Sequence, residues 1–320
     1  MKIGFHVFLA VAKELSFSEA AKQLHITPQC ASDHIRRLEQ EYQVTLFERK
    51  PHLSLTTAGK IMINSLQTIN ILENYMDKEL SGVSRGERGS FTLGISTSRA
   101  PIILPYVLPR YYQEFPDVNI SFSEEDTSLL EKRLISGEID LFIGINTTPH
   151  PELQIRTLAT EEIMLVISSR LLRQHFSSGE IEAMKNGIDL NRFAQVPFTL
   201  SFKGGKVNHV IQEYLNVYNL QLNVIYNISD SKTQIMLCTT GISATLCPRM
   251  LLSTAHQHNL SCNQWNYLHM FPVKNLGRQL RIDLVSRKNV VYPKFIQRFM
   301  GIMEEEVPAI IQMDLFNPPL

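Results

Sequence analysis

The sequence predicts an α/β protein with a small helical N-terminal domain, one long connecting helix and a larger region of alternating strands and helices. Three observations lead to this prediction. Apolar residues recur at helical spacing through the first 60 residues, an apolar stripe at the same spacing continues over residues 57–80, and short apolar runs alternate with helical patterns from residue 90 onward. The 320 residues are enough for about two domains, each with its own core.

The composition is ordinary for a globular protein, with 44% hydrophobic and 19% charged residues. No apolar run approaches the roughly 20 residues that cross a bilayer, and the N-terminus lacks the features of a secretory signal. We therefore expect a cytoplasmic protein that does not bind membranes. The 31 basic and 31 acidic residues balance, which leaves room for a local nucleic-acid-binding face. The four cysteines have no zinc-ligand spacing and do not form a disulfide framework.

The first 60 residues predict three short helices. The apolar face of the first helix is formed by Phe5, Phe8, Leu9 and Ala12. Ser18 is the expected cap of a short second helix. Thr27 and Pro28 then form a strong helix start, because a capping hydroxyl precedes a proline at the first helical position.

The third helix has an apolar face and a polar face. The apolar face, which we expect to pack on the first two helices, consists of Ala31, Ile35, Leu38 and Tyr42. The opposite face carries Gln29, Asp33, Arg36 and Gln40, flanked by Ser32 and Arg37. Such side chains suit base edges and phosphates in a major groove, although a polar helix face is more often simply solvated. Short strands at Val44–Leu46 and Leu53–Leu55 would add a wing, which completes a winged helix-turn-helix.

This domain resembles the LysR-type transcriptional regulators without a gap. The residues that carry the resemblance are Phe17-Ser18-Glu19-Ala20-Ala21, Leu24, Thr27-Pro28, Ser32, Ile35-Arg36-Arg37-Leu38-Glu39, Leu46-Phe47-Glu48-Arg49 and Leu55-Thr56-Thr57-Ala58-Gly59. The resemblance implies that the helix from Thr27 is the recognition helix and that Arg49 and the wing lie against the DNA backbone. Where the family usually has a basic residue at the wing tip, this chain has His52, so phosphate contact there is expected to be weaker or pH-dependent.

The candidate DNA-binding residues follow from the polar face and the resemblance together. Arg36 and Arg49 are expected to bind phosphates, whereas Gln29 and Ser32 are expected to read bases. The full set is Thr27, Pro28, Gln29, Ser32, Asp33, Arg36, Arg37, Arg49 and His52.

A long helix should follow, capped by Thr56 or Thr57 and running towards Leu80. Its apolar stripe is formed by Met62, Leu66, Ile69, Leu72, Met76 and Leu80. Few local elements are available to cover this stripe, so we expect it to pair two chains, as the resemblance also implies. The predicted division is a DNA-binding domain at 1–60, a dimerisation helix and glycine-containing hinge at 61–88, and a two-lobed domain at 89–320.

The first lobe (about 89–162 and 270–306) begins with a β-α-β-α-β pattern, which predicts a parallel sheet covered on both faces. Its strands are expected at Phe91–Ile95, Val118–Ser123 and Asp140–Gly144, with Gly137 ending the second helix. The strand Arg281–Val285 and a helix after Pro293 should return to this lobe.

The second lobe (about 163–269) repeats a similar series. Its strands are expected at Met164–Ser168, Phe198–Ser201, Asn223–Asn227 and Ile242–Leu246, with a helix from Ser231 that stops near Gly241. The resemblance continues more weakly in Leu104-Pro105, Phe115-Pro116-Asp117-Val118, Ser136-Gly137-Glu138-Ile139-Asp140-Leu141, Gly241-Ile242 and Leu246-Cys247-Pro248. It implies an effector domain whose architecture is similar to that of periplasmic binding proteins.

Hydroxyl and basic side chains follow the predicted strands, where ligands bind in parallel α/β sheets. The alternative for each hydroxyl is that it only caps its own helix. The candidate effector-binding residues are Ser96, Thr97, Ser98, Arg99, Thr127, Phe202, Lys203 and Ser229, of which Ser98, Thr127 and Phe202 match ligand-contacting positions in similar regulators. Arg99, Lys203 and Lys206 favour an anionic group, Asp126 and Asp230 oppose it, and the effector itself is unidentified.

Three other functions are alternatives to a ligand-switched regulator: an enzyme, a small-molecule-binding protein and a redox-responsive regulator. The sequence has no Walker loop, nucleophile elbow, zinc-protease motif or dinucleotide-binding turn, so we expect neither an enzyme nor a bound cofactor or metal. A transporter's solute-binding protein is disfavoured by the missing secretory signal and by the N-terminal domain, and a small-molecule-binding protein without regulated DNA binding stays an alternative. The C-x8-C spacing of Cys238 and Cys247 leaves a redox-responsive regulator as an alternative, which is disfavoured because both thiols look buried.

Together these features predict a nucleoid-associated transcriptional regulator of LysR type, switched by a small molecule bound between two lobes. Its expected partners are double-stranded DNA with an inverted-repeat promoter site and further copies of the chain, as a homodimer or homotetramer. RNA polymerase is kept as a further candidate partner.

Overall fold

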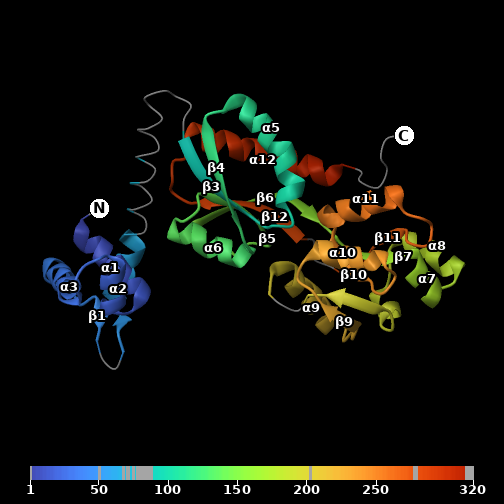
Figure 1. Ribbon diagram of the computed structural model, residues 1–320, viewed down its shortest axis with the longest axis horizontal. Coiled ribbons are helices and arrows are strands. Elements are labelled where there is room, and N and C mark those ends of the chain that lie inside the picture. The colour runs from blue at the N-terminus through green and yellow to red at the C-terminus, as the bar shows by residue number, and fades with distance from the viewer. Residues whose placement is uncertain are drawn as a thin grey trace. The chain divides into compact units, whose positions relative to one another are not determined.

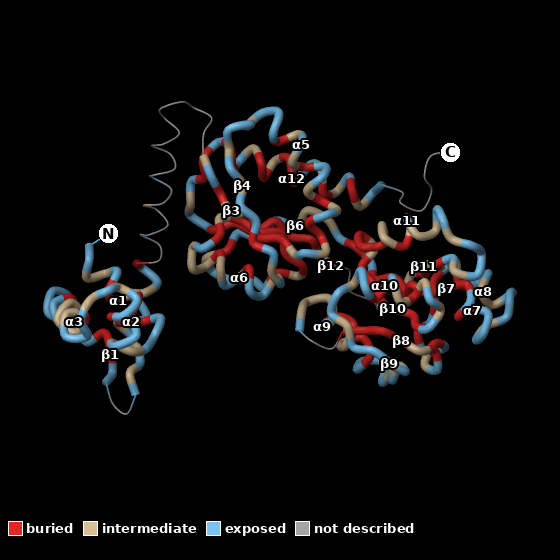
Figure 2. Tube along the Cα trace, in the orientation of Figure 1, coloured by how far each residue is buried: buried red, intermediate tan, exposed pale blue. Residues whose placement is uncertain are grey.

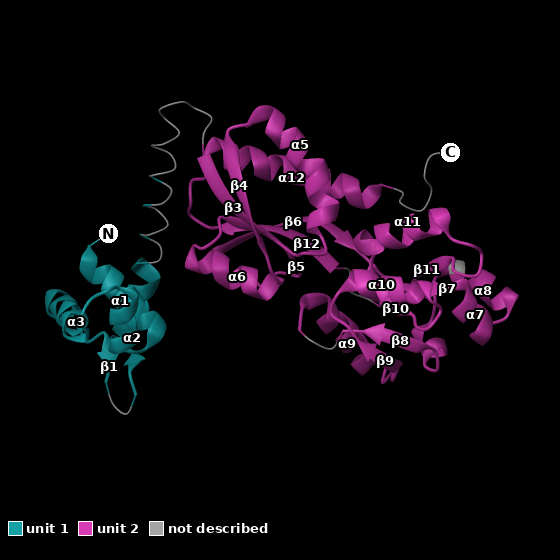
Figure 3. Ribbon diagram, in the orientation of Figure 1, with its two compact units in different colours: residues 1–86 teal, residues 87–320 magenta. Residues whose placement is uncertain are grey.

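The computed structural model describes residues 2–49, 52–66, 69, 73, 76, 89–201, 204–276 and 280–313. The chain divides into two compact units, Met1–Gly86 and Glu87–Leu320, which are described separately (Figure 3). Within the described ranges no helix has the length and apolarity to cross a membrane.

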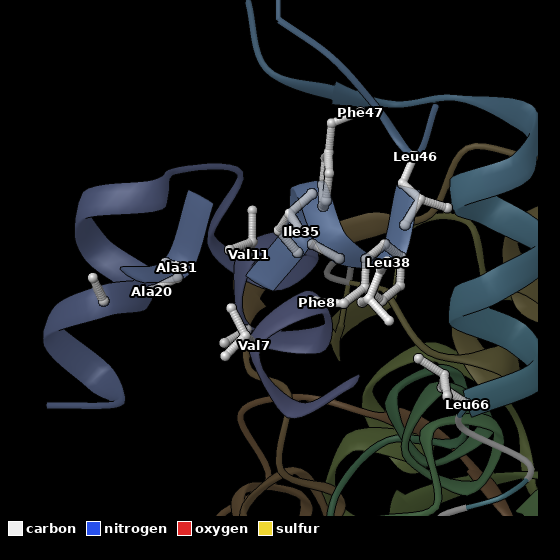
Figure 4. Close-up of a cluster of buried hydrophobic side chains, with 13 residues drawn as sticks. Val7, Phe8, Val11, Ala20, Ala31, Ile35, Leu38, Leu46, Phe47 and Leu66 are labelled. Atoms are coloured by element: carbon white, nitrogen blue, oxygen red, sulfur yellow. The ribbon is translucent and has the colours of Figure 1, made fainter. Parts of the chain in front are cut away.

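The described part of unit 1 up to residue 55 contains three helices and a two-stranded wing (Figure 1). The helices are α1 (Ile3–Glu14), α2 (Phe17–Gln23) and α3 (Pro28–Tyr42). They share one core, in which Phe8 and Ile35 are fully buried and Ala20 and Ala31 allow close packing (Figure 4). The three helices and the core positions Ala31, Ile35 and Leu38 agree with the prediction, but Tyr42 is 46% exposed.

The predicted N-terminal cap is correct for α3 and wrong for α2. Thr27 caps α3, accepting from Cys30 N at 3.1 Å, and Pro28 is its first residue, as predicted. The expected cap of α2 is wrong, because the extended residue Ser16 accepts from Glu19 N at 3.3 Å and Ser18 lies inside the helix.

The wing strands are β1 (Phe47–Glu48) and β2 (Ser54–Leu55), which pair antiparallel. Strand β1 begins at Phe47, directly after the strand predicted at Val44–Leu46. The reason is that the Glu39 carboxylate accepts from Leu46 N at 2.8 Å and from Phe47 N at 3.4 Å, while Leu46 O accepts from Thr56 N. A side chain on α3 therefore satisfies the backbone where we expected strand pairing.

A further helix begins at residue 57 and is described continuously to residue 66. Thr56 caps it, with Gly59 N donating to Thr56 Oγ1 at 3.0 Å. Leu66 is buried in the core of unit 1, so this core covers the start of the stripe. Ile69 and Met76 are 41% and 54% exposed, whereas Leu72 and Leu80 lie outside the described residues.

The first sheet of unit 2 has the strand order β4-β3-β5-β12-β6. Its strands are β3 (Gly89–Ile95), β4 (Val118–Glu124), β5 (Leu141–Ile145), β6 (Leu153–Glu161) and β12 (Leu280–Arg287). Strands β3, β4 and β5 are parallel, as predicted, whereas β12 runs antiparallel to β5 and β6. Helices α5 (Ala100–Glu114) and α12 (Lys294–Gln312) lie on one side and α6 (Thr127–Ser136) on the other (Figure 1).

Two smaller sheets make up the rest of unit 2. Antiparallel strands β7 (Ile163–Ser168), β10 (Thr245–Pro248) and β11 (Leu268–Pro272) form one, and parallel strands β8 (Pro197–Leu200) and β9 (Asn223–Asn227) form the other. Their cores are the buried segments around β7, β8 and β10 in Figure 2. The helices are α7 (Ser169–His175), α8 (Ser178–Ala183), α9 (Lys206–Val217), α10 (Ser231–Thr239) and α11 (Ser253–Ser261), with 3-10 turns at Met184–Asn186, Leu190–Phe193 and Arg249–Leu252.

We call the part built on the five-stranded sheet lobe I and the part built on the two smaller sheets lobe II. The prediction missed β6 in lobe I and β11, α7, α8 and α11 in lobe II. It also set β10 too early, at Ile242–Leu246, because a turn at Gly241 (φ +75°) and a bend at Ile242 come first, and Ala244 then bridges to Phe198 of β8 rather than to β7.

Candidate DNA-binding surface and ligand cleft

The side of α3 that faces away from the core carries polar side chains. Gln29, Arg36 and Arg37 are exposed, and Ser32 and Asp33 are half-buried. Arg36 Nη2 donates to Asp33 Oδ1 at 2.9 Å. The hydroxyl of Thr27 already accepts the capping bond, and Pro28 is exposed beside it. The polar face predicted from the sequence is therefore present as one surface.

The side chain of Arg49, directly after β1 of the wing, lies against residues of α2 and α3. Its Nη2 lies 3.8 Å from Glu39 Oε2, and its guanidinium lies 5.7 Å from the centre of the Phe17 ring. The side chain is still 54% exposed, so several N–H donors remain for a phosphate. His52 is exposed on the wing, whose tip residues 50 and 51 lie outside the described residues.

Unit 2 contains a cleft of about 350 Å³ between its two lobes. Its lining comes from the segment before α5, the start of α6 and strand β5 in lobe I, and from the starts of α9 and α10 and strand β10 in lobe II. Of the predicted effector-binding residues, the cleft brings together Ser96, Ser98, Arg99, Thr127 and Ser229.

The other predicted effector-binding residues are not among the lining. Thr97 is exposed and lines a separate apolar groove along α5, with Leu104, Leu108 and Tyr112. Phe202 and Lys203 lie outside the described residues. In the turn from Ser96 to Arg99, Thr97 thus faces the groove along α5, whereas its neighbours line the cleft.

Arg99 is the most buried cation of the cleft, with 3% of its surface exposed. It forms a short ion pair with Glu161, the last residue of β6, which is 2% exposed. Glu161 Oε2 also accepts from Met250 N at 2.8 Å in lobe II, so one carboxylate contacts both lobes. The Nε atom of Arg99 is buried and has no hydrogen-bond partner.

A second polar link between the lobes lies at Lys206, the first residue of α9. Its Nζ donates to Thr148 Oγ1 at 2.7 Å and lies 3.4 Å from Glu131 Oε1, both in lobe I. Each of these two cleft cations is therefore already paired with a carboxylate of this chain.

Several lining residues were absent from the predicted set. The apolar ones are Ile143, Ile145, Leu246, Pro248 and Leu251, and the polar ones include Asp126, Ser201, Lys206, Asn208, Ser231 and Gln234. Gln234 is occupied at both ends, donating to Ile228 O at 2.5 Å and accepting from Thr245 Oγ1 at 2.8 Å. Sequence position alone points to Ile143 and Ile145, because they lie at the carboxyl end of a parallel strand, just as Ser96 and Ser98 follow the end of β3.

The cysteines of the redox alternative lie in the core of lobe II. Cys238 and Cys247 are fully buried in an apolar cluster with Met164, Val166 and Leu252. Burial raises the pKa of both thiols, which disfavours the reactive thiolate. Among the described residues no group of histidine, cysteine and acidic side chains could hold a metal ion.

Known proteins share both the fold and the domain order. Residues 4–60 match the helix-turn-helix domain of bacterial regulatory proteins of the lysR family, and residues 84–307 match the LysR substrate binding domain. An uncharacterized HTH-type transcriptional regulator of Bacillus subtilis, YcgK, is 24% identical over 75% of this chain and 78% of its own length.

Solved structures extend the likeness over nearly the whole chain. Full-length CbnR in complex with its target DNA has a TM-score of 0.56 at 19% identity, covering 96% of this chain and 100% of that one. ArgP from Mycobacterium tuberculosis has a TM-score of 0.63 at 16% identity, covering 98% and 97%. The predicted fold, a helix-turn-helix followed by an effector domain of periplasmic-binding-protein type, is confirmed. The chain belongs to the LysR family of DNA-binding transcriptional regulators.

Proposed function

We propose that this regulator is switched by a small molecule with an anionic group, bound in the cleft between lobes I and II. In this proposal residues 1–60 bind DNA, residues 61–88 pair two chains and residues 89–320 bind the effector. The observation that carries it is the buried Arg99 Nε at the cleft, which has an N–H to donate and no acceptor in the protein.

The ends of the surrounding helices support an anionic ligand. The caps of α5, α6 and α9 are Arg99, Asp126 and Gly205, and none of them makes a side-chain capping bond. Free N–H groups and the positive end of the helix dipole favour negative charge at such positions. Hydroxyls of Ser98 and Thr127 add neutral donors. At about 350 Å³ the cleft is at the small end of ligand sites, which favours a metabolite over a larger compound.

The two links between the lobes suggest how binding reaches the rest of unit 2. Glu161 contacts Arg99 in lobe I and Met250 in lobe II, and Lys206 of lobe II contacts Glu131 of lobe I. An anionic ligand group competes with these carboxylates for the two cations. At Lys206 this competition weakens the contact with Glu131 of lobe I, and it thereby favours another relative orientation of the lobes.

Self-association is supported by apolar side chains that the chain leaves exposed. Ile69 and Met76 of the linker stripe are exposed. In unit 2 the outer strands β4 and β9 expose Phe122, Ile225 and Tyr226. Exposed outer strands are usually covered or blunted in stable proteins. We propose a homodimer or homotetramer that binds an inverted-repeat site, with RNA polymerase as a further partner.

The proposed effector class is tested by thermal unfolding of the full chain with small carboxylates, their neutral amides and other metabolites. A ligand at about 100 times its dissociation constant stabilises the protein by about 2.7 kcal/mol. We expect a carboxylate to raise the melting temperature while its amide does not. Arg99→Lys should weaken this response, because lysine keeps the charge but lacks the Nε–H.

Thr97→Ala provides the matched control, since Thr97 lies in the same turn but lines the other groove. We expect it to keep the full response, whereas Ser98→Ala should reduce it. Equal responses in Thr97→Ala, Ser98→Ala and Arg99→Lys would place the ligand elsewhere. Stabilisation by amides and carboxylates alike would rule out the anionic class.

A further inference from the structure

The outward face of α3 carries a carboxylate at its centre. Ile35 and Leu38 face the core of unit 1, and with 3.6 residues per turn Asp33 lies on the opposite side of the helix. Gln29 precedes it by one turn on the same side. In a helix-turn-helix the N-terminal part of this helix contacts base edges. Asp33 is therefore at a position that faces DNA in a protein of this family.

This position is electrostatically unfavourable for an acidic residue that only faces solvent. The duplex carries a dense row of phosphates, which repel a carboxylate on the bound face. Asp33 does have a partner, because Arg36 Nη2 donates to its Oδ1 at 2.9 Å. However, an exposed pair three residues apart on a helix contributes little to stability. Helix stability alone thus gives little reason for an acidic residue here.

The pair leaves matched donors and acceptors for a base pair. Asp33 has a second oxygen, Oδ2, and a guanidinium has five N–H donors, of which the bond to Asp33 uses one. The side chains of Arg36 and Asp33 are 65% and 38% exposed, so both can reach a ligand. In the major groove, arginine pairs with guanine O6 and N7, and an acidic side chain accepts from the cytosine N4 amine.

We propose that Asp33 and Arg36 act together to read one G·C base pair in each half of the DNA site. Arg36 donates to guanine O6 and N7, and Asp33 Oδ2 accepts from the cytosine N4 amine. The bond between the two side chains holds the guanidinium in place. This assigns Arg36 to a base edge rather than to the phosphate contact that its sequence position led us to expect.

The test is in vitro selection of duplexes with a randomised centre by the full-length protein, followed by competition between duplexes that differ at one position. We expect one G·C pair in each half-site to depend on Asp33. Asp33→Ala should reduce discrimination at that position about tenfold, since a good base contact is worth that much or more. Asp33→Asn should move the preference there to A·T, because asparagine pairs with adenine N6 and N7.

Glu19→Gln is the matched control. Glu19 forms the same kind of pair on α2, three residues before Lys22, with Lys22 Nζ 2.7 Å from its Oε1. Glu19→Gln removes the same charge as Asp33→Asn. We therefore expect it to change the affinity uniformly and to keep the wild-type base preference at every position. If Asp33→Ala and Asp33→Asn also bind all sequences more tightly without a change of preference, the carboxylate only tunes repulsion and the proposal is wrong. Both positions are solvent-exposed or half-buried, and melting curves check that each variant folds.

Discussion

On α3 of unit 1 the candidate DNA-binding side chains follow one another along a single helix, whereas the cleft of unit 2 collects its lining from the ends of at least five elements. Gln29 and Arg37 share a surface because of helical spacing alone. Ser98 and Ser229 share one only because two lobes fold against each other. A linear motif predicts the first kind of site, and only a correct fold predicts the second.

The two sites also differ in how their charges are balanced. Arg37 and Arg49 are exposed at the surface of unit 1, where the polyanionic partner can neutralise them. In the cleft, Arg99 and Lys206 are paired with Glu161 and Glu131 of the same chain. DNA binding should therefore depend steeply on salt, whereas the anionic effector that we propose for the cleft has to compete with Glu161 and Glu131 for the two cations.

The largest expected effect is on the buried pair of the cleft. Glu161→Ala leaves the Arg99 guanidinium buried without a counter-charge and removes the acceptor of Met250 N. We expect the free energy of unfolding to fall by about 3–5 kcal/mol, as when one partner of a buried pair is removed. Chemical denaturation of the full chain, followed by tryptophan fluorescence, measures the loss.

The double variant Arg99→Leu/Glu161→Leu distinguishes the effect of an unpaired buried charge from the effect of lost side-chain packing. Removing both charges avoids the uncompensated cation, so we expect it to unfold less easily than Glu161→Ala. If the single and double variants lose equal stability, then the charge balance of the cleft is not what the pair provides. The contrast between the two sites would then rest on geometry alone.

A smaller effect is expected at the DNA-binding surface. Arg49→Ala removes a charged donor near the wing, which should weaken binding about tenfold for every DNA sequence, since charged hydrogen bonds contribute about 1.5–3 kcal/mol. The slope of log affinity against log salt should fall by about one. Fluorescence anisotropy with specific and unrelated duplexes over a range of salt concentrations measures both.

Gln29→Ala is the matched substitution on α3. It removes no charge, so we expect an unchanged salt slope and a loss of preference at particular bases. A loss confined to the specific duplex in Arg49→Ala would contradict the phosphate role and would make Arg49 a base-reading residue.

Local chemistry determined which parts of the fold could be predicted. Thr27 with Pro28 starts α3, and Gly137 ends α6 at φ +79°, because each residue has a conformational preference that its neighbours do not override. The start of α2 was harder, since Ser16 and Ser18 are both good caps. The backbone chooses Ser16, whose extended conformation at φ −152° frees its hydroxyl for Glu19 N.

Features fixed by distant parts of the chain escaped prediction. In strand β6 the alternation of apolar and polar residues stops after Arg156, and the strand is defined by its pairing with β12 at the edge of the sheet. The antiparallel sheet of lobe II depends on β7 meeting β10 and β11 from far along the sequence. The same dependence hid the role of Glu161, whose two contacts, Arg99 and Met250, lie 62 and 89 residues away.

The smallest expected effect concerns the thiols, and it tests whether the apolar core of lobe II is as closed as its burial indicates. Burial holds the pKa of Cys238 and Cys247 well above the usual range, so both stay protonated at pH 8. Cys30 on α3 and Cys262 are partly accessible. We expect iodoacetamide to label only Cys30 and Cys262 in the native chain, as mass spectrometry of peptides would show, and mild peroxide to leave DNA binding of a Cys30→Ser/Cys262→Ser variant unchanged. Rapid labelling of Cys238 or Cys247, or a peroxide effect that survives in that variant, would instead favour the redox-responsive regulator.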